Sequence, residues 1–108
     1  MGQTVAREGD EVNTGHGCDA TTKIAEIASA SRRVVICGKD AAVVGDPMED
    51  HTITNPLPPP APTCIFHEGA VINAGSAKVL VGGKGLARQD DSADLGTITS
   101  GCSTVLAG

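Results

Sequence analysis

The stretch SRRVVICGKDAAVVGD (residues 31–46) recurs as SAKVLVGGKGLARQDD (residues 76–91). Both copies contain, at the same spacing, a serine, an aliphatic run, a Gly-Lys pair, an alanine and a closing aspartate. The C-terminal GCSTVLAG (101–108) repeats only the first half of this unit, and the N-terminal TVAREGD (4–10) repeats only the second half. Because such a chain can complete a further unit by joining its ends, the sequence predicts three similar units around an approximate threefold axis.

Each unit has the pattern of a β-hairpin, with a short aliphatic run, a turn containing Gly-Lys and a second short run. The expected strand pairs are 34–36 with 41–44, 79–81 with 86–89, and 104–106 with 4–7. The third pair would form between the termini without a covalent turn. The length and the pattern therefore predict one mainly β domain, made of short antiparallel hairpins and covering residues 1–108.

The core of such a domain is expected to be thin. Phe66 is the only aromatic residue, so burial must come from Val, Ile, Leu and Ala. A domain of this size hides only roughly two-thirds of the surface of its unfolded chain. We therefore expect an additional source of stability, such as a metal ion, a partner or tight sheet geometry.

The charge pattern argues against binding to nucleic acid. The formal net charge is −5, and the chain has no basic run and no cluster of aromatic residues. No apolar stretch approaches the ~18 residues of a membrane span. The first ten residues, MGQTVAREGD, lack the apolar region of a signal peptide, so we expect a protein made in the cytoplasm that does not use the general secretory route.

Three connections join the predicted hairpins. In the first (11–29), the segment TTKIAEIASA (21–30) is compatible with a helical turn or two and equally with an extended strand. The second (47–75) contains NPLPPPAP (55–62), which predicts a stiff polyproline II segment. That segment is either a rigid surface loop or a ligand for a proline-binding domain. The third connection (92–100) is the shortest.

All three histidines lie in the first two connections, and they suggest a metal site. Cys64 and His67 form a C-x-x-H pair, and His16 and His51 would complete a set of three imidazoles and one thiolate. Four such ligands satisfy tetrahedral zinc and leave no open position, so the ion would be structural. Ordinary loop histidines are the alternative interpretation, and Cys18 is the main rival to Cys64 as the thiolate.

The four cysteines permit disulfides by number, but no secretion signal supports an oxidising environment. They are therefore predicted to be thiols. Cys37 ends a predicted strand, and Cys102 takes the place of the repeated serine. Both of these are expected to behave as small buried residues.

The sequence predicts no enzyme. The Gly83-Lys84 pair lacks the other residues of a phosphate-binding loop, and no G-x-S-x-G motif is present. A hydrolase using Cys64 and His67 is disfavoured because residues three apart in a loop rarely form a nucleophile and base with an orienting partner. The aspartates that close the units are expected to accept hydrogen bonds from nearby backbone amides in turns. These are Asp10, Asp46 and Asp91.

The same residues resemble the PAAR-repeat family over nearly the whole chain, from about residue 5 to residue 108. The segment VAREGD (5–10) followed by His16-Gly17 is similar to the start of these proteins. The Pro-Ala-Ala-Arg quartet that names the family is degraded here: DAAV (40–43) keeps the two alanines, whereas GLAR (85–88) keeps only the final Ala-Arg.

The resemblance implies a small three-sided cone that caps and sharpens a trimeric β-helical spike (VgrG-like, or the central spike of a phage tail). Such a tip belongs to a contractile injection machine, either a type VI secretion system or a phage tail, and its point leads through the target membrane. One copy per spike trimer is implied, and any effector cargo is expected to be a separate polypeptide. The finished tip would be delivered outside the cell.

The resemblance also implies one structural zinc ion near the point of the cone. Carried over by position, its ligands would be His16, His51, Cys64 and His67. The family often has a cysteine in the third connection, where this sequence has Leu95. The alternative function from another class is a small zinc-binding β adaptor that recruits a partner through its proline-rich loop.

Overall fold

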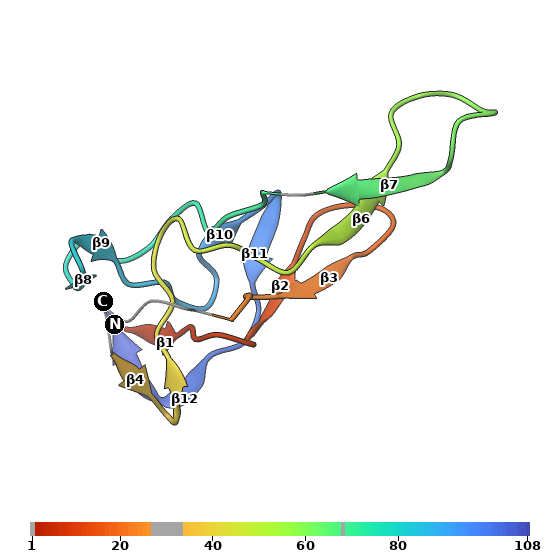
Figure 1. Cartoon of the computed structure of the whole chain (residues 1–108). Helices are drawn as coiled ribbons and strands as arrows, with labels where there is room; N and C mark the ends of the chain where they lie inside the picture. The colour runs from red at the N-terminus through yellow and green to blue at the C-terminus, as the bar shows by residue number, and fades with distance from the viewer. Residues whose placement is uncertain (1, 27–33, 68) are drawn as a thin grey trace.

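The two ends of the chain lie side by side. Strand β1 (Gln3–Val5) pairs antiparallel with β12 (Cys102–Ala107), so that Gln3 lies opposite Ala107 and Thr4 opposite Leu106 (Figure 1). This computed structural model describes residues 2–26, 34–67 and 69–108. The pairing confirms the prediction of a third hairpin between the termini.

The regular structure of the described part of the chain consists of short antiparallel strands, and this part contains no helix. Strands β10, β11, β2 and β3 form a four-stranded sheet in that order, and the other strands pair two by two. Besides β1 and β12, the strands are β2 (Glu11–Asn13), β3 (Thr21–Lys23), β4 (Val35–Ile36), β5 (Lys39–Asp40), β6 (His51–Thr54), β7 (Cys64–His67), β8 (Leu80–Val81), β9 (Lys84–Gly85), β10 (Ser92–Ala93) and β11 (Gly96–Ile98). The segment 21–30 therefore begins as a strand, and residues 27–30 of that prediction lie outside the described part.

Two of the three repeated hairpins, β4–β5 and β8–β9, have a covalent turn, and this turn is tighter than the sequence predicted. Cys37 and Gly38 have φ angles of 51° and 81°, and Gly82 and Gly83 have φ angles of 61° and 83°. Positive φ at both central residues is the signature of a two-residue turn that suits the twist of a hairpin. The second strand of each hairpin consequently begins at the lysine of the Gly-Lys pair, two residues earlier than expected.

A closed ring of three alanines marks the pseudo-threefold axis. The backbone N–H of Ala6 donates to the carbonyl of Ala87 (2.9 Å), that of Ala87 to Ala42 (2.8 Å), and that of Ala42 back to Ala6 (3.0 Å). All three alanines have 0% exposure. Because each unit contributes one donor and one acceptor at an equivalent position, the ring confirms the predicted threefold arrangement.

Three aspartates, each four residues after a ring alanine, close the turns that leave the axis. Their carboxylates accept backbone hydrogen bonds of 2.7, 2.8 and 2.9 Å from the residue three positions earlier. The donor and acceptor pairs are Arg7 with Asp10, Val43 with Asp46, and Arg88 with Asp91. The prediction that these aspartates form turns is therefore confirmed.

The core is aliphatic and lies in two clusters. The larger one surrounds the alanine ring and contains Ile24, Ile72 and Ile98 among its fully buried side chains. The smaller one lies between the three hairpins, with Val5 and Leu86 among its members. Phe66 is 77% exposed, so the single aromatic residue adds little to either cluster.

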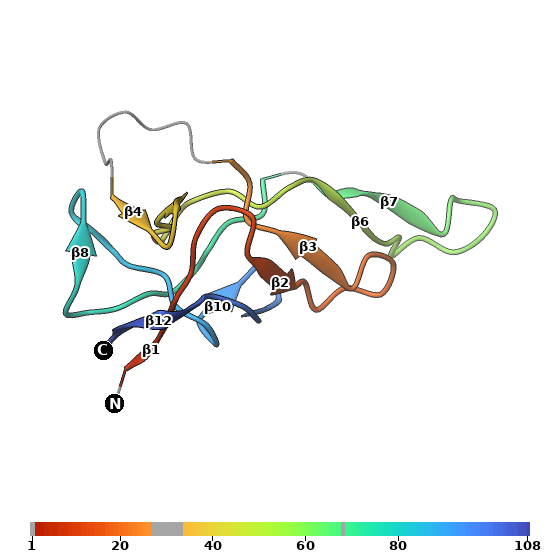
Figure 2. The ribbon, with the colours of Figure 1, turned by 90° about the horizontal axis from the view of Figure 1, so that it is seen from below.

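The molecule measures 47 × 30 × 22 Å and has two different ends. The β4–β5, β8–β9 and β1–β12 hairpins gather at one end, and the β6–β7 hairpin extends from the other (Figures 1 and 2). Within the described ranges, no helix is long and apolar enough to cross a membrane.

The proline-rich segment forms the loop at the far end of the β6–β7 hairpin. Asn55 N–H donates to the carbonyl of Thr63 (2.9 Å) and closes the loop, while Ala61 N–H donates to the carbonyl of Pro58 (3.3 Å). The second bond defines a turn inside the proline run. The prediction of one continuous polyproline II segment is therefore wrong, because that helix has no internal hydrogen bonds.

The cysteines are paired, and the prediction of free thiols is wrong. Cys18 bonds Cys64, and Cys37 bonds Cys102, with Cα atoms 6.1 and 6.2 Å apart. Both Cα separations lie in the usual range for disulfides. Cys37 is exposed at its turn rather than buried, whereas Cys102 is buried as expected. Their bond ties the terminal strand β12 to the β4–β5 hairpin.

Candidate metal centre

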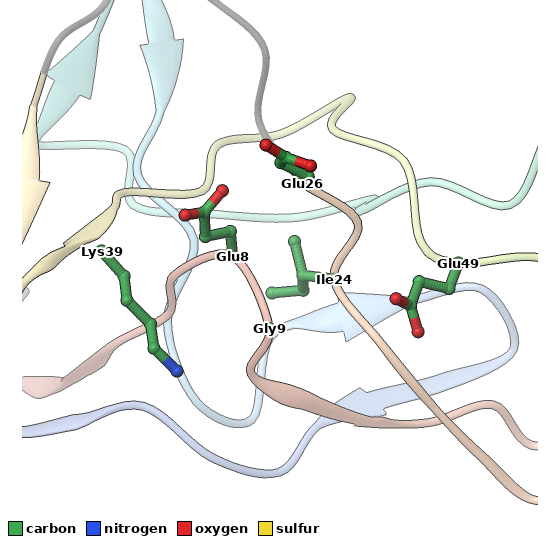
Figure 3. A pocket seen from close by; sticks show the side chains of 6 residues that line it. All are labelled: Glu8, Gly9, Ile24, Glu26, Lys39 and Glu49. Atoms are coloured by element: carbon green, nitrogen blue, oxygen red, sulfur yellow. The ribbon is translucent and has the colours of Figure 1, made fainter.

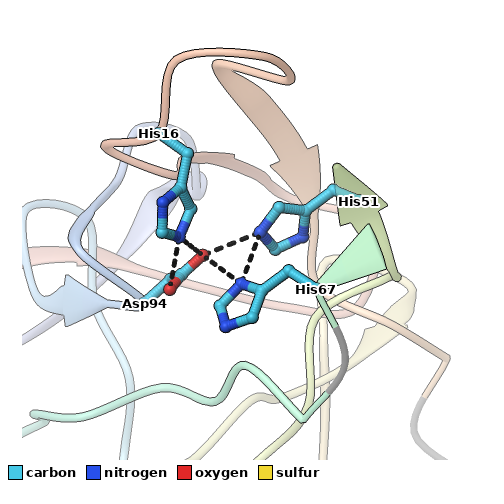
Figure 4. A group of neighbouring side chains, drawn as sticks. All are labelled: His16, His51, His67 and Asp94. Carbon is cyan, nitrogen blue, oxygen red and sulfur yellow. Dashed lines mark hydrogen bonds and ion pairs between the residues drawn. The ribbon is translucent and has the colours of Figure 1, made fainter. Parts of the chain in front are cut away.

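Three histidines and one aspartate converge between the four-stranded sheet and the β6–β7 hairpin (Figure 4). They are His16, His51, His67 and Asp94, and one ligand atom from each lies within 4.8 Å of the others. The four residues come from all three connections between the repeated units. The centre therefore draws distant parts of the chain together around one point.

The β6–β7 register places two of the histidines. His51 lies directly opposite His67 across the hairpin, and opposed residues in an antiparallel pair project to the same face. His51 Nε2 and His67 Nδ1 are 3.2 Å apart. His51 is only 4% exposed, whereas His67 is half-buried, so one imidazole of the pair lies inside the protein and the other lies nearer the solvent.

His51 is oriented by its own backbone neighbourhood. Its Nδ1 lies 3.0 Å from the carbonyl oxygen of Glu49. A carbonyl can only accept, so Nδ1 carries the proton and donates this bond. The neutral ring therefore presents the lone pair of Nε2 to the centre, which is the arrangement that metal-binding histidines usually have.

A tight turn between β2 and β3 brings in His16. Gly15 has a φ of 75°, and a Cβ at this position would lie 2.6 Å from the carbonyl oxygen of Leu95. The Thr14 hydroxyl accepts a hydrogen bond from His16 N–H (3.1 Å) and donates to the carbonyl of Asp19 (2.6 Å). These contacts direct the imidazole toward Asp94.

Asp94 lies in the turn between β10 and β11, with a φ of 54°. Its N–H donates to the carbonyl of Val71 (3.1 Å), and its own carbonyl accepts from Asn73 Nδ2 (2.8 Å). Its Oδ2 lies 2.9, 2.8 and 3.4 Å from the nearest nitrogens of His16, His51 and His67 respectively. One carboxylate oxygen thus faces all three imidazoles.

The sequence hypothesis placed Cys64 where the structure places Asp94, and that assignment is corrected. Cys64 and His67 both belong to β7, and residues three apart in a strand project to opposite faces. The Cys64 side chain is turned away from the imidazoles and is bonded to Cys18. Cys18, the rival thiolate, is used in the same bond. The three histidines, by contrast, lie together as expected.

The missed residue is adjacent to a position that the sequence hypothesis considered. Leu95, which occupies the position of the family's cysteine, is 73% exposed. Asp94 precedes it and is the only acidic residue in the connection 92–100. A carboxylate is an accepted zinc donor, so a search for any ligand type in this connection would have found it.

The chemistry of the four side chains fits a bound cation. His51 Nε2 and Asp94 Oδ2 are both acceptors when the imidazole is neutral, yet they lie 2.8 Å apart. Two lone pairs at that distance require a proton or a cation between them. Three imidazole nitrogens and one carboxylate oxygen form a donor set typical of divalent transition metals.

A concave region of the described surface has different chemistry from the histidine cluster. A shallow pocket of about 300 Å³ is lined by Glu8, Gly9, Ile24, Glu26, Lys39 and Glu49 (Figure 3). Its polar groups are three carboxylates and one ammonium, with no imidazole or thiol. The metal-ligating side chains therefore lie outside this pocket.

Comparison with known proteins adds no family assignment. The sequence matches no protein-family model and no curated protein sequence. The resemblance to PAAR-repeat proteins rests on the quoted residues alone.

Proposed function

We propose that this protein is a metal-stabilised structural tip that caps a trimeric β-helical spike of a contractile injection machine. The observation that carries the proposal is a set of three aliphatic side chains, one on each hairpin. Val35, Leu80 and Leu106 are 61%, 59% and 61% exposed. They are named here the aliphatic triad.

The triad follows the pseudo-threefold axis. Its members lie opposite Asp40, Gly85 and Thr4 in their hairpins. Each of these three residues is followed by a residue that forms a β-bridge to another unit, namely Ala41, Leu86 and Val5. Large apolar side chains at symmetric, exposed positions favour a docking surface over chance exposure. A threefold arrangement within one chain matches a partner whose three copies present the same patch, so one copy per trimer is the expected stoichiometry.

The far end of the molecule suits a stiff point. The metal centre joins the β2–β3 turn, the base of the β6–β7 hairpin and the β10–β11 turn, and the β6–β7 hairpin forms the end of the molecule opposite the three repeated hairpins (Figures 1 and 2). Four protein ligands would leave no open coordination position, which favours a structural ion over a catalytic one. Zinc is the ion proposed, since imidazole and carboxylate in a four-coordinate site are its usual donors.

The proposal is tested by docking to the trimeric spike protein of the source organism's own contractile machine. Native mass spectrometry of the mixture should show one copy of this chain per trimer. Leu80→Glu should weaken that complex, because a charge would replace an apolar contact. Leu95→Glu is the control, since Leu95 is also an exposed leucine (73%, against 59% for Leu80) but lies beside the metal centre. Equal docking of the two variants would remove the aliphatic triad from the interface.

The adaptor alternative is favoured by one feature, the exposed Leu57 within the proline-rich loop. Deleting residues 56–62 separates the two functions. A spike tip would keep its spike after this deletion, because the loop lies at the opposite end from the aliphatic triad. An adaptor would lose its partner.

A further inference from the structure

The Cys18–Cys64 disulfide joins the two segments that carry the outer histidines of the metal centre. Cys18 follows His16 by two residues in the β2–β3 turn, and Cys64 precedes His67 by three residues in β7. His51 and His67 are held together by the hairpin register without this bond. The disulfide therefore acts mainly on the position of His16 relative to that pair.

The other contacts between the β2–β3 turn and the β6–β7 hairpin are made with β6 and lie near the solvent. Asp19 N–H donates to the carbonyl of Thr52 (3.0 Å), and the Asp19 carboxylate accepts from the Thr52 N–H and hydroxyl (2.8 Å each). Gly17 packs against the Thr54 side chain so closely that a Cβ would collide with it. A neutral hydrogen bond contributes about 0.5–1.5 kcal/mol and one to a carboxylate up to about 3 kcal/mol, and each can open independently, so a covalent bond is the stronger restraint.

We propose that the Cys18–Cys64 bond is a redox-sensitive clamp that sets the metal affinity of the His16, His51, His67 and Asp94 centre. The clamp rests on the metal centre of the proposed function, but not on the identity of the spike. With the bond formed, His16 is presented to the centre in advance. With the bond reduced, binding of the ion must also order the β2–β3 turn. Part of the binding free energy is used for that ordering, so the affinity for the metal falls.

The chemistry is an ordinary two-electron thiol exchange. Reduction by an external dithiol adds two electrons and two protons, which breaks the S–S bond, leaves two thiols and converts the dithiol into its own disulfide. Oxidised glutathione or a comparable disulfide reverses the step and takes up the two electrons. The clamp would therefore be open in a reducing compartment and closed in an oxidising one.

The same bond also keeps two sulfur atoms from acting as thiolate ligands. A free thiolate is a good zinc donor, and reduction would release two of them near the centre. Because β7 turns Cys64 away from the imidazoles, we expect its sulfur to stay outside the coordination sphere after reduction, and the clamp requires the same of Cys18. The ligand set should be the same in both redox states, and only its preorganisation should change.

The test is a calorimetric Zn²⁺ titration of the full chain, oxidised and after reduction with a phosphine, alongside the Cys18→Ser/Cys64→Ser variant. Reduction and the double substitution should each weaken binding by about ten- to hundredfold, the usual effect of losing a group that orients a ligand. The Cys37→Ser/Cys102→Ser variant, which keeps the clamp, is the control and should respond to reduction as the parent does. Circular dichroism checks that every form is folded.

Co²⁺ substitution supplies the second readout. Absence of a sulfur-to-cobalt charge-transfer band in the reduced protein would support the clamp. A band that is lost in Cys64→Ser or in Cys18→Ser, together with tighter binding, would overturn it and make that cysteine a ligand. Equal affinity in the oxidised and reduced states would overturn it as well. So would an absence of Zn²⁺ binding in both states. Only that last outcome would also remove the metal from the proposed function, leaving spike docking to its own test.

Discussion

His51 lies directly opposite His67 in the β6–β7 hairpin, with 3.2 Å between the facing ring nitrogens. The two residues are 16 positions apart in sequence and belong to a connection rather than to a repeated unit. An antiparallel register is thus sufficient to build half of the centre. The same register explains why Phe66, which neighbours His67, faces outward.

His67→Ala should release the ion and lower thermal stability, because it removes one of four donors. An ion held at one hundred times its dissociation constant stabilises a fold by about 2.7 kcal/mol, so the loss should be visible in a thermal melt. Elemental mass spectrometry gives the metal content. Phe66→Ala is the matched control on the same strand. Retention of one ion per chain in His67→Ala would exclude His67 as a ligand.

Asp94→Asn should weaken Zn²⁺ binding by at least about tenfold while leaving the backbone of the β10–β11 turn in place. The amide has nearly the shape of the carboxylate but lacks its charge. The hydrogen bonds that hold the turn come from the Asp94 backbone and not from its side chain. Calorimetry measures the change, and Asp90→Asn, in a neighbouring turn residue that also has positive φ, is the control. Unchanged affinity would show that three imidazoles suffice.

The sequence contained more of the fold than of the site. The repeat alignment was enough to predict the hairpins, the joined termini and the turn aspartates, since equivalent residues perform equivalent roles around the axis. The ligand set depends on the face of the strand from which each side chain projects, and sequence spacing alone does not reveal this. The side chains of a C-x-x-H pair converge on one point in a turn but diverge in a strand, so the prediction of Cys64 as a ligand is wrong because Cys64 lies in β7.

The disulfides were missed for a different reason. The partners are 46 and 65 residues apart, and each pair joins different units or connections. Their proximity is a consequence of the folded arrangement and not of any local pattern. The lack of a signal peptide predicts thiols, but it concerns the route of export and not the distance between sulfur atoms.

Asp19 should respond to acid in a way that reports on the β2–β3 turn. Hydrogen bonds from the Thr52 N–H and hydroxyl, with a smaller contribution from the charge of His51, hold the pKa of Asp19 below its ordinary value of 3.8. A lowered folded-state pKa means that the contact stabilises the fold above the unfolded-state value and is lost as the pH falls through the folded-state value. The Thr52 amide resonance of metal-free protein should therefore shift with a midpoint below 3.8. Asp19→Asn should abolish that shift, and a midpoint at or above the ordinary value would contradict the hydrogen bonds.

Ala42→Leu should destabilise the protein by about 1–3 kcal/mol, the usual cost of forcing extra methylene groups into a filled core. Ala42 is fully buried, and its backbone belongs to the three-bond ring with Ala6 and Ala87. A larger side chain at the axis would press on all three units at once, so the loss should appear as one cooperative transition in chemical denaturation. Ala77→Leu, at an exposed site outside the ring, should be close to neutral. If the two variants unfold at the same denaturant concentration, the alanine ring does not limit the packing at the axis, and the threefold closure must be maintained by the hairpins alone.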